Sequence, residues 1–134
     1  MSMGCHLLDQ LPHRSYDEGG THVVELDITD EIRGPRGAVH GGLIACLADR
    51  AGAYAAVRSS RRPVVTSSVA LSYMASARVG PLRAVADPLR IGGQQGVVEV
   101  RVYDDGEEHR LVATALLTMS FLPGEFTAST RSGS

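Results

Sequence analysis

The stretch LIACLADRAGAYAAV, residues 43–57, decides the fold of this 134-residue chain. Good helix formers occupy most of its positions, and small or apolar residues on every side predict a helix that is buried all round. Only Asp49, Arg50 and the phenol of Tyr54 interrupt this apolar surface. A carboxylate in such surroundings is unfavourable unless it is paired or partly hydrated, so Asp49 is the first candidate for a functional residue.

Five or so further segments have the pattern of β-strands. In residues 22–28, which precede the helix, apolar side chains alternate with acidic ones as in a half-buried strand. Among the later segments, short turns at residues 92–95 and 104–106 favour antiparallel hairpins. Pro88 predicts a bulge or a sheet edge where it occurs. The later segments are residues 64–74, 82–91, 96–103 and 110–122.

One helix and these strands pack most economically as a single antiparallel sheet curled around the helix, an α+β fold. Helix surface that one sheet cannot cover predicts a dimer. The length predicts one domain, residues 1–134, with an ordered core of about residues 21–122. Before the core we expect at most a short helical turn around residues 7–11, and we expect a mobile tail at 123–134.

Composition and charge exclude several functions. The formal net charge is −2 and the arginines are scattered, so we expect no nucleic-acid partner. Two cysteines and five histidines show no metal-ligand spacing, so we expect no metal and no other cofactor. A signal-like N-terminus and a run of about 18 apolar residues are both lacking, so we expect no membrane partner and a cytoplasmic location.

The segment GAVHGGLIACLAD, residues 37–49, resembles the His-Gly-Gly-…-Asp motif of the PaaI-like acyl-CoA thioesterases of the hotdog-fold superfamily. Residues 64–77 with the following Gly80-Pro81-Leu82 look like that family's second strand and turn, and residues 22–122 keep its order of elements. The resemblance implies a hotdog fold, a curved antiparallel sheet around a long central helix. It also implies hydrolysis of an acyl-CoA thioester to a free acid and CoA, in a homodimer or homotetramer with active sites at the subunit interface.

The glycine pair Gly41 and Gly42 opens the helix. Backbone N–H groups at a helix N-terminus can stabilise the negative charge that develops on an attacked thioester carbonyl. The resemblance makes the Gly41 N–H the main donor, places Gly42 against the substrate, and has His40 position the turn or hydrogen-bond near the thioester. A structural explanation also exists, because His-Gly-Gly makes a tight entry to a packed helix.

Asp49 is expected to act as a general base on water or to attack the thioester and form an anhydride. It lies eight residues after Gly41, about 12 Å along the helix axis. One subunit therefore cannot easily bring both groups to one carbon, and the resemblance implies that the carboxylate comes from the facing helix of a partner. The alternative for Asp49 is an ion pair with an arginine such as Arg50.

Thr66 matches the position where related thioesterases carry a hydroxyl that helps to hold the nucleophilic water. Ser67 and Ser68 follow it, and strand alternation predicts that Thr66 and Ser68 point one way and Ser67 the other. Ordinary strand hydroxyls are the alternative. Gly34 stands where many relatives carry asparagine, which puts a usual contact or the rate in doubt, and Arg36 is a candidate substitute.

Three arginines, Arg61, Arg62 and Arg90, are candidates for binding the phosphates of CoA, although most exposed arginines are merely solvated. Two other functions remain open. A non-catalytic acyl-CoA binding protein would keep the fold without turnover. A hotdog hydratase or dehydratase would need a catalytic histidine paired with an acid, and His40 is the only nearby histidine.

Overall fold

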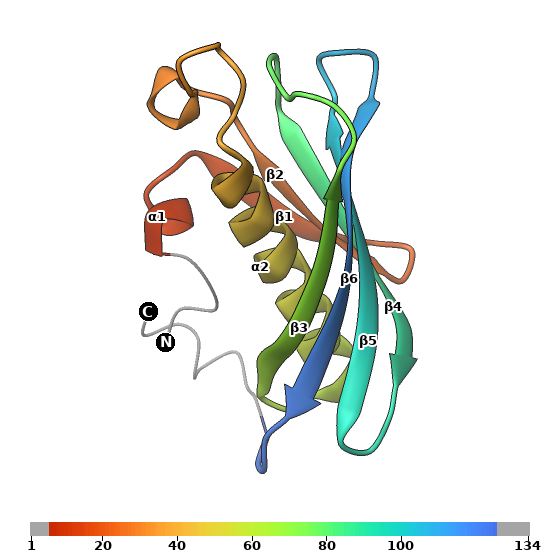
Figure 1. Ribbon diagram of the computed structural model, residues 1–134. Helices are drawn as coiled ribbons and strands as arrows, with labels where there is room; N and C mark the ends of the chain where they lie inside the picture. Colours follow the sequence, from red (N-terminus) through yellow and green to blue (C-terminus); the bar gives the residue numbers. More distant parts are fainter. Residues whose placement is uncertain (1–5, 126–134) are drawn as a thin grey trace.

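In the computed structural model, which describes residues 6–125, one curved antiparallel sheet of six strands wraps around a single long helix (Figure 1). The helix is α2 (Gly41–Ser60), and a short helix α1 (His6–Asp9) and a 3-10 turn η1 (Asp30–Ile32) precede it. The strands are β1 (His13–Glu18), β2 (Thr21–Leu26), β3 (Val64–Tyr73), β4 (Leu82–Ile91), β5 (Gln95–Asp104) and β6 (Arg110–Phe121). The expected α+β hotdog architecture is confirmed.

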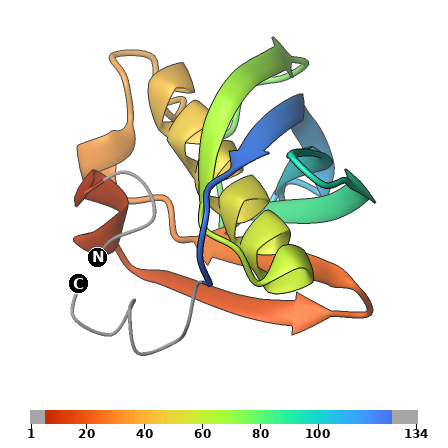
Figure 2. The same cartoon turned by 90° about the horizontal axis from the view of Figure 1, so that it is seen from below.

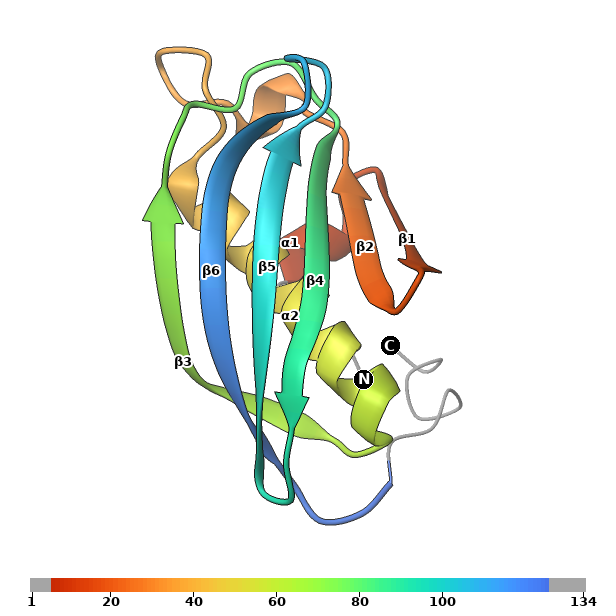
Figure 3. The same cartoon turned by 90° about the vertical axis from the view of Figure 1, so that its right-hand side faces the viewer.

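The order of strands across the sheet is β1-β2-β4-β5-β6-β3 (Figure 3). The expected hairpins join β4 to β5 and β5 to β6. Seen from below, the sheet curls around α2 from β1 and β2 on one side to β3 on the other (Figure 2). β1 and β3 are therefore the two edges of the sheet. Within residues 6–125, no helix is both long and apolar enough to span a membrane.

The core lies between α2 and the concave face of the sheet. Small helix residues such as Ala48 and Ala51 are fully buried there, and they let the helix approach the sheet closely. Leu47 from the helix and Leu117 from β6 are fully buried as well. The helix is buried over most of its surface but not all round, because Ala45, Cys46 and Asp49 stay partly exposed, and it extends beyond the expected 43–57 at both ends.

The expectation of little ordered structure before residue 21 was wrong for β1. The sequence HRSYDE has no apolar face, and all six residues of β1 are exposed. The strand forms because its backbone pairs with β2 across a turn at Gly19 and Gly20, whose φ angles are 56° and 90°. The expected short helical turn is present as α1. The expected mobile tail lies outside the described residues from residue 126 onward.

Two strands contain bulges, and one of them changes the orientation of candidate residues. The expected bulge at Pro88 is confirmed by a register shift between Pro88 and Arg90. A second shift lies between Thr66 and Ser68 in β3, so that Thr66 pairs with Met119 and Ser68 with the adjacent Thr118. Thr66 and Ser68 therefore point to opposite faces of the sheet, and the prediction that they share a face was wrong.

The bulge also determines which face of the sheet the later side chains of β3 occupy. Val69, Leu71 and Tyr73 pair with Leu117, Ala115 and Ala113 on β6, and those partners are buried on the helix side. Ser67 is the extra residue of the bulge, and its hydroxyl contacts that of Ser120. Thr66 and Tyr73 consequently face α2 from the two ends of one strand.

Candidate active site

The N-terminus of α2 presents open backbone N–H groups. His40 is the N-cap residue, and its side chain makes no capping hydrogen bond. The first N–H groups of a helix have no partner within the helix. Gly42 is exposed, and a β-carbon added there would meet nothing within 4 Å. Free amides at a helix N-terminus, such as those at Gly41 and Gly42, are able to stabilise a negative charge placed against them.

Tyr73 supports this helix start from the end of β3, a contact that the sequence did not reveal. Its hydroxyl donates a hydrogen bond to the carbonyl oxygen of Gly41 at 2.6 Å. A β-carbon at position 41 would lie 3.2 Å from the Tyr73 hydroxyl oxygen, so glycine keeps this close approach possible. Strand alternation counted from Thr66 without a bulge would have turned Tyr73 away from the helix.

The backbone of His40 is held in place while its ring stays exposed. Its N–H donates to the carbonyl oxygen of Ile32 at 3.1 Å. A β-carbon at Gly34 would lie 3.4 Å from Cε1 of His40, so any side chain at position 34 would stand next to this ring. Arg36 is exposed, and its carbonyl oxygen accepts a hydrogen bond from Arg78 at 2.7 Å.

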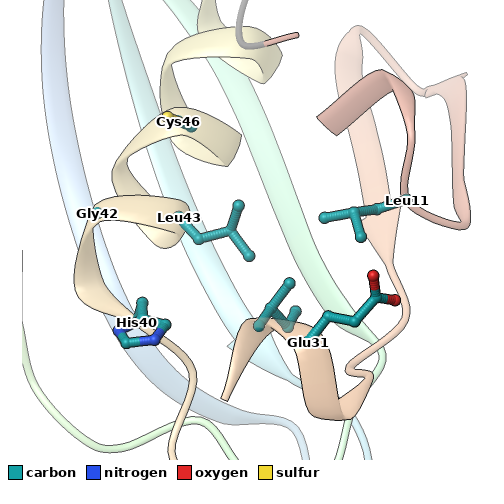
Figure 4. A pocket seen from close by; sticks show the side chains of 7 residues that line it. Leu11, Glu31, His40, Gly42, Leu43 and Cys46 are labelled. Carbon is teal, nitrogen blue, oxygen red and sulfur yellow. The ribbon is translucent and has the colours of Figure 1, made fainter. Parts of the chain in front are cut away.

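A cavity of about 290 Å³ opens beside the helix N-terminus (Figure 4). Its walls come from the segment after α1, from η1 and from the first two turns of α2. Most of the side chains that line it are apolar, and Glu31 and His40 are the exceptions. The lining residues are Leu11, Glu31, Ile32, His40, Gly42, Leu43 and Cys46.

Asp49 is half-buried and forms a hydrogen bond with β3. The Thr66 hydroxyl donates to Oδ1 of Asp49 at 2.6 Å, and the same hydroxyl oxygen lies 3.4 Å from the sulfur of Met119. Arg50 pairs instead with Asp9 on α1 at 2.7 Å. Within residues 6–125 Asp49 has no ion-pair partner, so the alternative of an Asp49–Arg50 pair was wrong.

The structure thus assembles two separate groups along α2. One contains Gly41, Tyr73 and His40, and the other contains Asp49 and Thr66. Asp49 lies eight positions after Gly41 on the helix, about 12 Å along the axis. Ser67 and Ser68 lie on the outer face of the sheet and approach neither group.

The three candidate arginines lie at the other end of α2. Arg62 donates to carbonyl oxygens of the β4–β5 turn, 2.8 Å from that of Gly92, and its guanidinium carbon lies 4.0 Å from the ring centre of Phe121. Arg61 ends α2 in the left-handed conformation and is exposed, as is Arg90. Arg62 is therefore occupied by contacts within the chain, whereas the other two guanidinium groups face solvent.

Histidine–carboxylate pairs occur away from the helix N-terminus. His22 lies 2.9 Å from Asp17, and His109 lies 3.0 Å from Asp105. His40 has no carboxylate partner in the described part of the chain. Among the same residues, no group of three or more histidine, cysteine or acidic side chains is arranged to hold a metal ion.

A buried carboxylate fixes the loop that supports this end of the molecule. Burial by itself raises the pKa of Asp104, but hydrogen bonds from the backbone N–H groups of Arg78, Val79, Gly80 and Gly106 outweigh it and hold the pKa below its ordinary value. The distances are 2.8 Å, 3.0 Å and 2.6 Å for the first three. In the same loop, the carbonyl oxygen of Ala77 accepts a hydrogen bond at 2.9 Å from the backbone N–H of Val39, the residue before His40.

Comparison with known sequences gives consistent matches over this region. A family model described as the thioesterase superfamily matches residues 36–110. The 1,4-dihydroxy-2-naphthoyl-CoA hydrolase of Listeria monocytogenes is 29% identical over 93 residues, which cover 68% of this chain and 76% of that protein. The proofreading thioesterase EntH of Cronobacter sakazakii is 32% identical over 90 residues, covering 66% of this chain and 64% of that protein.

Solved structures show the same fold. The PaaI protein of Escherichia coli, from the phenylacetic acid degradation operon, superposes with a TM-score of 0.81 at 24% identity, covering 90% of this chain and 87% of that one. A hypothetical thioesterase protein of Streptococcus pneumoniae, solved with coenzyme A, gives a TM-score of 0.77 at 21% identity, covering 87% of this chain and 89% of that one.

Proposed function

The chain belongs to the thioesterase superfamily and is a thioester hydrolase, and from this premise we propose that it hydrolyses acyl-CoA thioesters with Asp49 as the catalytic carboxylate. The match of the thioesterase superfamily model to residues 36–110 confirms the family resemblance of residues 37–49. The observation that carries the proposal is the 2.6 Å hydrogen bond from Thr66 to Asp49. This bond holds a half-buried carboxylate at the surface of α2. The other two polar residues in the apolar stretch have different partners, since Arg50 pairs with Asp9 and the Tyr54 ring packs against His22.

The helix N-terminus supplies the groups that polarise the thioester carbonyl. A thioester carbonyl oxygen placed against the Gly41 and Gly42 amides gains hydrogen bonds that strengthen as negative charge develops. The macrodipole of the helix adds partial positive charge at the same point. The Tyr73 hydroxyl fixes the peptide group between Gly41 and Gly42, which carries the Gly42 N–H, and the His40 ring borders the place where the acyl group would lie.

Asp49 supplies the other half by one of two routes. Thr66 binds Oδ1, and in the described part of the chain Oδ2 has no hydrogen-bond partner. As a general base, the carboxylate takes a proton from a water that attacks the carbonyl, and the C–S bond then breaks to release CoA thiolate. As a nucleophile, it attacks the carbonyl, expels the thiolate and forms a mixed anhydride that water cleaves. In the first route the proton passes from Asp49 to the departing thiolate, and both routes end with Asp49 as the carboxylate.

A second copy of the chain completes the site in this proposal. Gly42, Ala45, Cys46 and Asp49 lie along one stripe of α2 at helical spacing, and all four keep some exposure. Edge strand β3 runs beside them and is exposed along most of its length. Pairing two copies through this side would bring the Asp49 of one chain towards the helix N-terminus of the other. A tetramer would follow from pairing two such dimers.

The names of the relatives point to coenzyme A thioesters as the substrates. One relative is named for a naphthoyl-CoA substrate, and a neighbour of the same fold was solved with coenzyme A. Aromatic acyl-CoA thioesters therefore come first among the substrates to test. Arg61 and Arg90 remain candidates for contact with the CoA phosphates because their side chains are exposed. Arg62 is a weaker candidate because it already binds the β4–β5 turn.

The test is release of CoA thiol from a panel of aryl- and alkyl-CoA thioesters by the wild type and Asp49→Asn. We expect the variant to lose roughly 10³-fold in kcat, the range of general acid–base catalysis. Asp87→Asn is the matched control, since this exposed aspartate lies on β4 away from both groups. Circular dichroism and sedimentation show whether each variant keeps its fold and assembly. A rate for Asp49→Asn within a few-fold of wild type contradicts the assigned role.

A binding protein without turnover is the second candidate, and Gly34 is the observation that favours it. Position 34 lies beside the His40 ring. Many members of the PaaI-like family carry asparagine at this position, and this chain has no amide side chain there. If the wild type binds acyl-CoA thioesters but releases no CoA from any of them, this function replaces hydrolysis. A hydratase is disfavoured because His40 has no acidic partner among the described residues.

A further inference from the structure

The cavity beside the helix N-terminus has two distinct ends. His40 and Gly42 border one end, next to the amides that would bind the thioester carbonyl. Leu43 and Leu11 point toward each other across the middle, and the carboxylate of Glu31 lies beside Leu11 (Figure 4). An acyl group that enters from the helix start would therefore bring its far end towards Glu31.

The volume of the cavity indicates the size of acyl group that its walls can enclose. An apolar cavity of about 150 Å³ holds a benzene ring in a protein interior. A cavity of about 290 Å³ therefore accommodates one substituted or two fused rings, or a short chain. A long fatty acyl chain exceeds this space. The apolar walls favour such a group without selecting one by hydrogen bonds.

Glu31 is the one acidic side chain among the described residues that line the cavity, and no lysine or arginine lines it. An ionised carboxylate accepts hydrogen bonds and donates none. Its negative charge opposes a second carboxylate brought close to it. The far end of the cavity is thus suited to a neutral group and unsuited to an anionic one.

We propose that this cavity receives the acyl group and that Glu31 makes the site select compact, uncharged acyl groups over those with a distal carboxylate. The proposal rests on the proposed function, because it assigns the acyl end of the same substrate. It adds a specificity-determining residue that the catalytic groups do not include.

The experiment compares two pairs of thioesters that differ at the far end of the acyl group. Hexanoyl-CoA is paired with adipoyl-CoA, and 4-methylbenzoyl-CoA with 4-carboxybenzoyl-CoA. In Glu31→Gln, we expect the ratio of kcat/KM for the carboxylated member to that for the neutral member to rise roughly tenfold over wild type. The gain should shrink at high ionic strength because salt screens exposed charges, which a merely structural effect would not do.

Asp30→Asn is the matched control, because it removes the same charge from the adjacent residue of η1 without touching the cavity lining. Its ratio should equal that of wild type. Equal ratios in all three proteins, or equal changes in the two variants, overturn the proposal while leaving hydrolysis itself intact.

Calorimetric binding to the Asp49→Asn protein separates failure of this proposal from failure of the proposed function. Glu31→Gln added to that background should raise affinity for the carboxylated thioesters relative to the neutral ones. If this occurs although wild type releases no CoA, the cavity assignment stands and hydrolysis fails. If CoA is released but neither rates nor affinities respond to Glu31→Gln, hydrolysis stands and the role of Glu31 fails.

Discussion

The two edges of the sheet are built on opposite principles. β1 is six residues long and contains Arg14, Asp17 and Glu18, whereas β3 is ten residues long, VVTSSVALSY, and contains no charged residue. Both strands are exposed, and an exposed strand edge readily pairs with another chain unless charge or shortness prevents it. The difference supports the proposal that β3, and not the charged and short β1, is the edge that meets a second copy.

The side chains of the two edges also have different partners. On β1, Arg14 lies 3.1 Å from Asp27 and the Tyr16 hydroxyl donates to Glu25 at 2.6 Å, while Asp17 pairs with Arg58 in the last turn of α2, far from the helix start. On β3, Thr66 and Tyr73 reach across to Asp49 and to the helix start. The uncharged edge is therefore also the edge that carries the site.

Among substitutions that test the two edges, the largest effect should come from a charge placed on the uncharged edge β3, called the open edge below. Val69 faces the helix side of β3 and is 45% exposed. In Val69→Lys, an unpaired charge would enter the proposed interface, which is strongly unfavourable. We expect a monomer in sedimentation velocity and at least a roughly 100-fold loss of hydrolysis, because the two halves of the site separate.

Ser15→Lys on β1 is the control for that substitution. Ser15 pairs with the buried Val24 and so lies on the same side of the sheet, but on the charged edge β1. This variant should keep its assembly and its rate. A fully active dimer of Val69→Lys, or a dissociated Ser15→Lys, would show that the contrast between the edges is mistaken.

A smaller effect should come from Asp104, which anchors the loop that follows the open edge. Asp104→Asn weakens a set of charge-assisted hydrogen bonds and should lower the free energy of unfolding by about 2 kcal/mol. Because the folded pKa of Asp104 is depressed, its contribution is present above the ordinary value of 3.8 and is lost as pH falls through the folded pKa. Chemical denaturation should be measured at equal protein concentration, at neutral pH and again below the folded pKa of Asp104. The free energies of unfolding of wild type and Asp104→Asn should converge at the lower pH.

Asp87→Asn serves again as the control for stability, since Asp87 is exposed and lies away from this loop. An unchanged stability of Asp104→Asn at neutral pH, or a difference from wild type that grows in acid, would contradict the assigned role of the buried carboxylate.

The smallest effect should come from two matched tyrosines, one on each edge. Tyr73→Phe removes the hydrogen bond to the Gly41 carbonyl and should lower kcat roughly fivefold, about 1 kcal/mol, because the Gly41–Gly42 peptide group at the helix start becomes less well fixed. Tyr16→Phe removes a hydrogen bond of the same length, to Glu25, and should leave kcat unchanged. Equal effects of the two substitutions would remove any special role for Tyr73.

Local sequence signals were sufficient for most of the fold. The apolar stretch at 43–57 predicted the central helix, and the glycine-rich and acidic turns predicted the late hairpins, because helix propensity and turn chemistry depend on neighbouring residues. The same stretch singled out Asp49, because a carboxylate among apolar side chains is conspicuous. The family segment at 37–49 then indicated the kind of reaction.

Contacts between distant segments decided the rest. β1 depends on its pairing with β2, and the bulge at Ser67 depends on how β3 aligns with β6. That bulge places both Thr66 and Tyr73 on the helix side, which simple alternation denies. Strand register and side-chain partners are set by residues far away in the chain, so the sequence by itself determined the helix and its carboxylate, and only the tertiary structure decided what surrounds them.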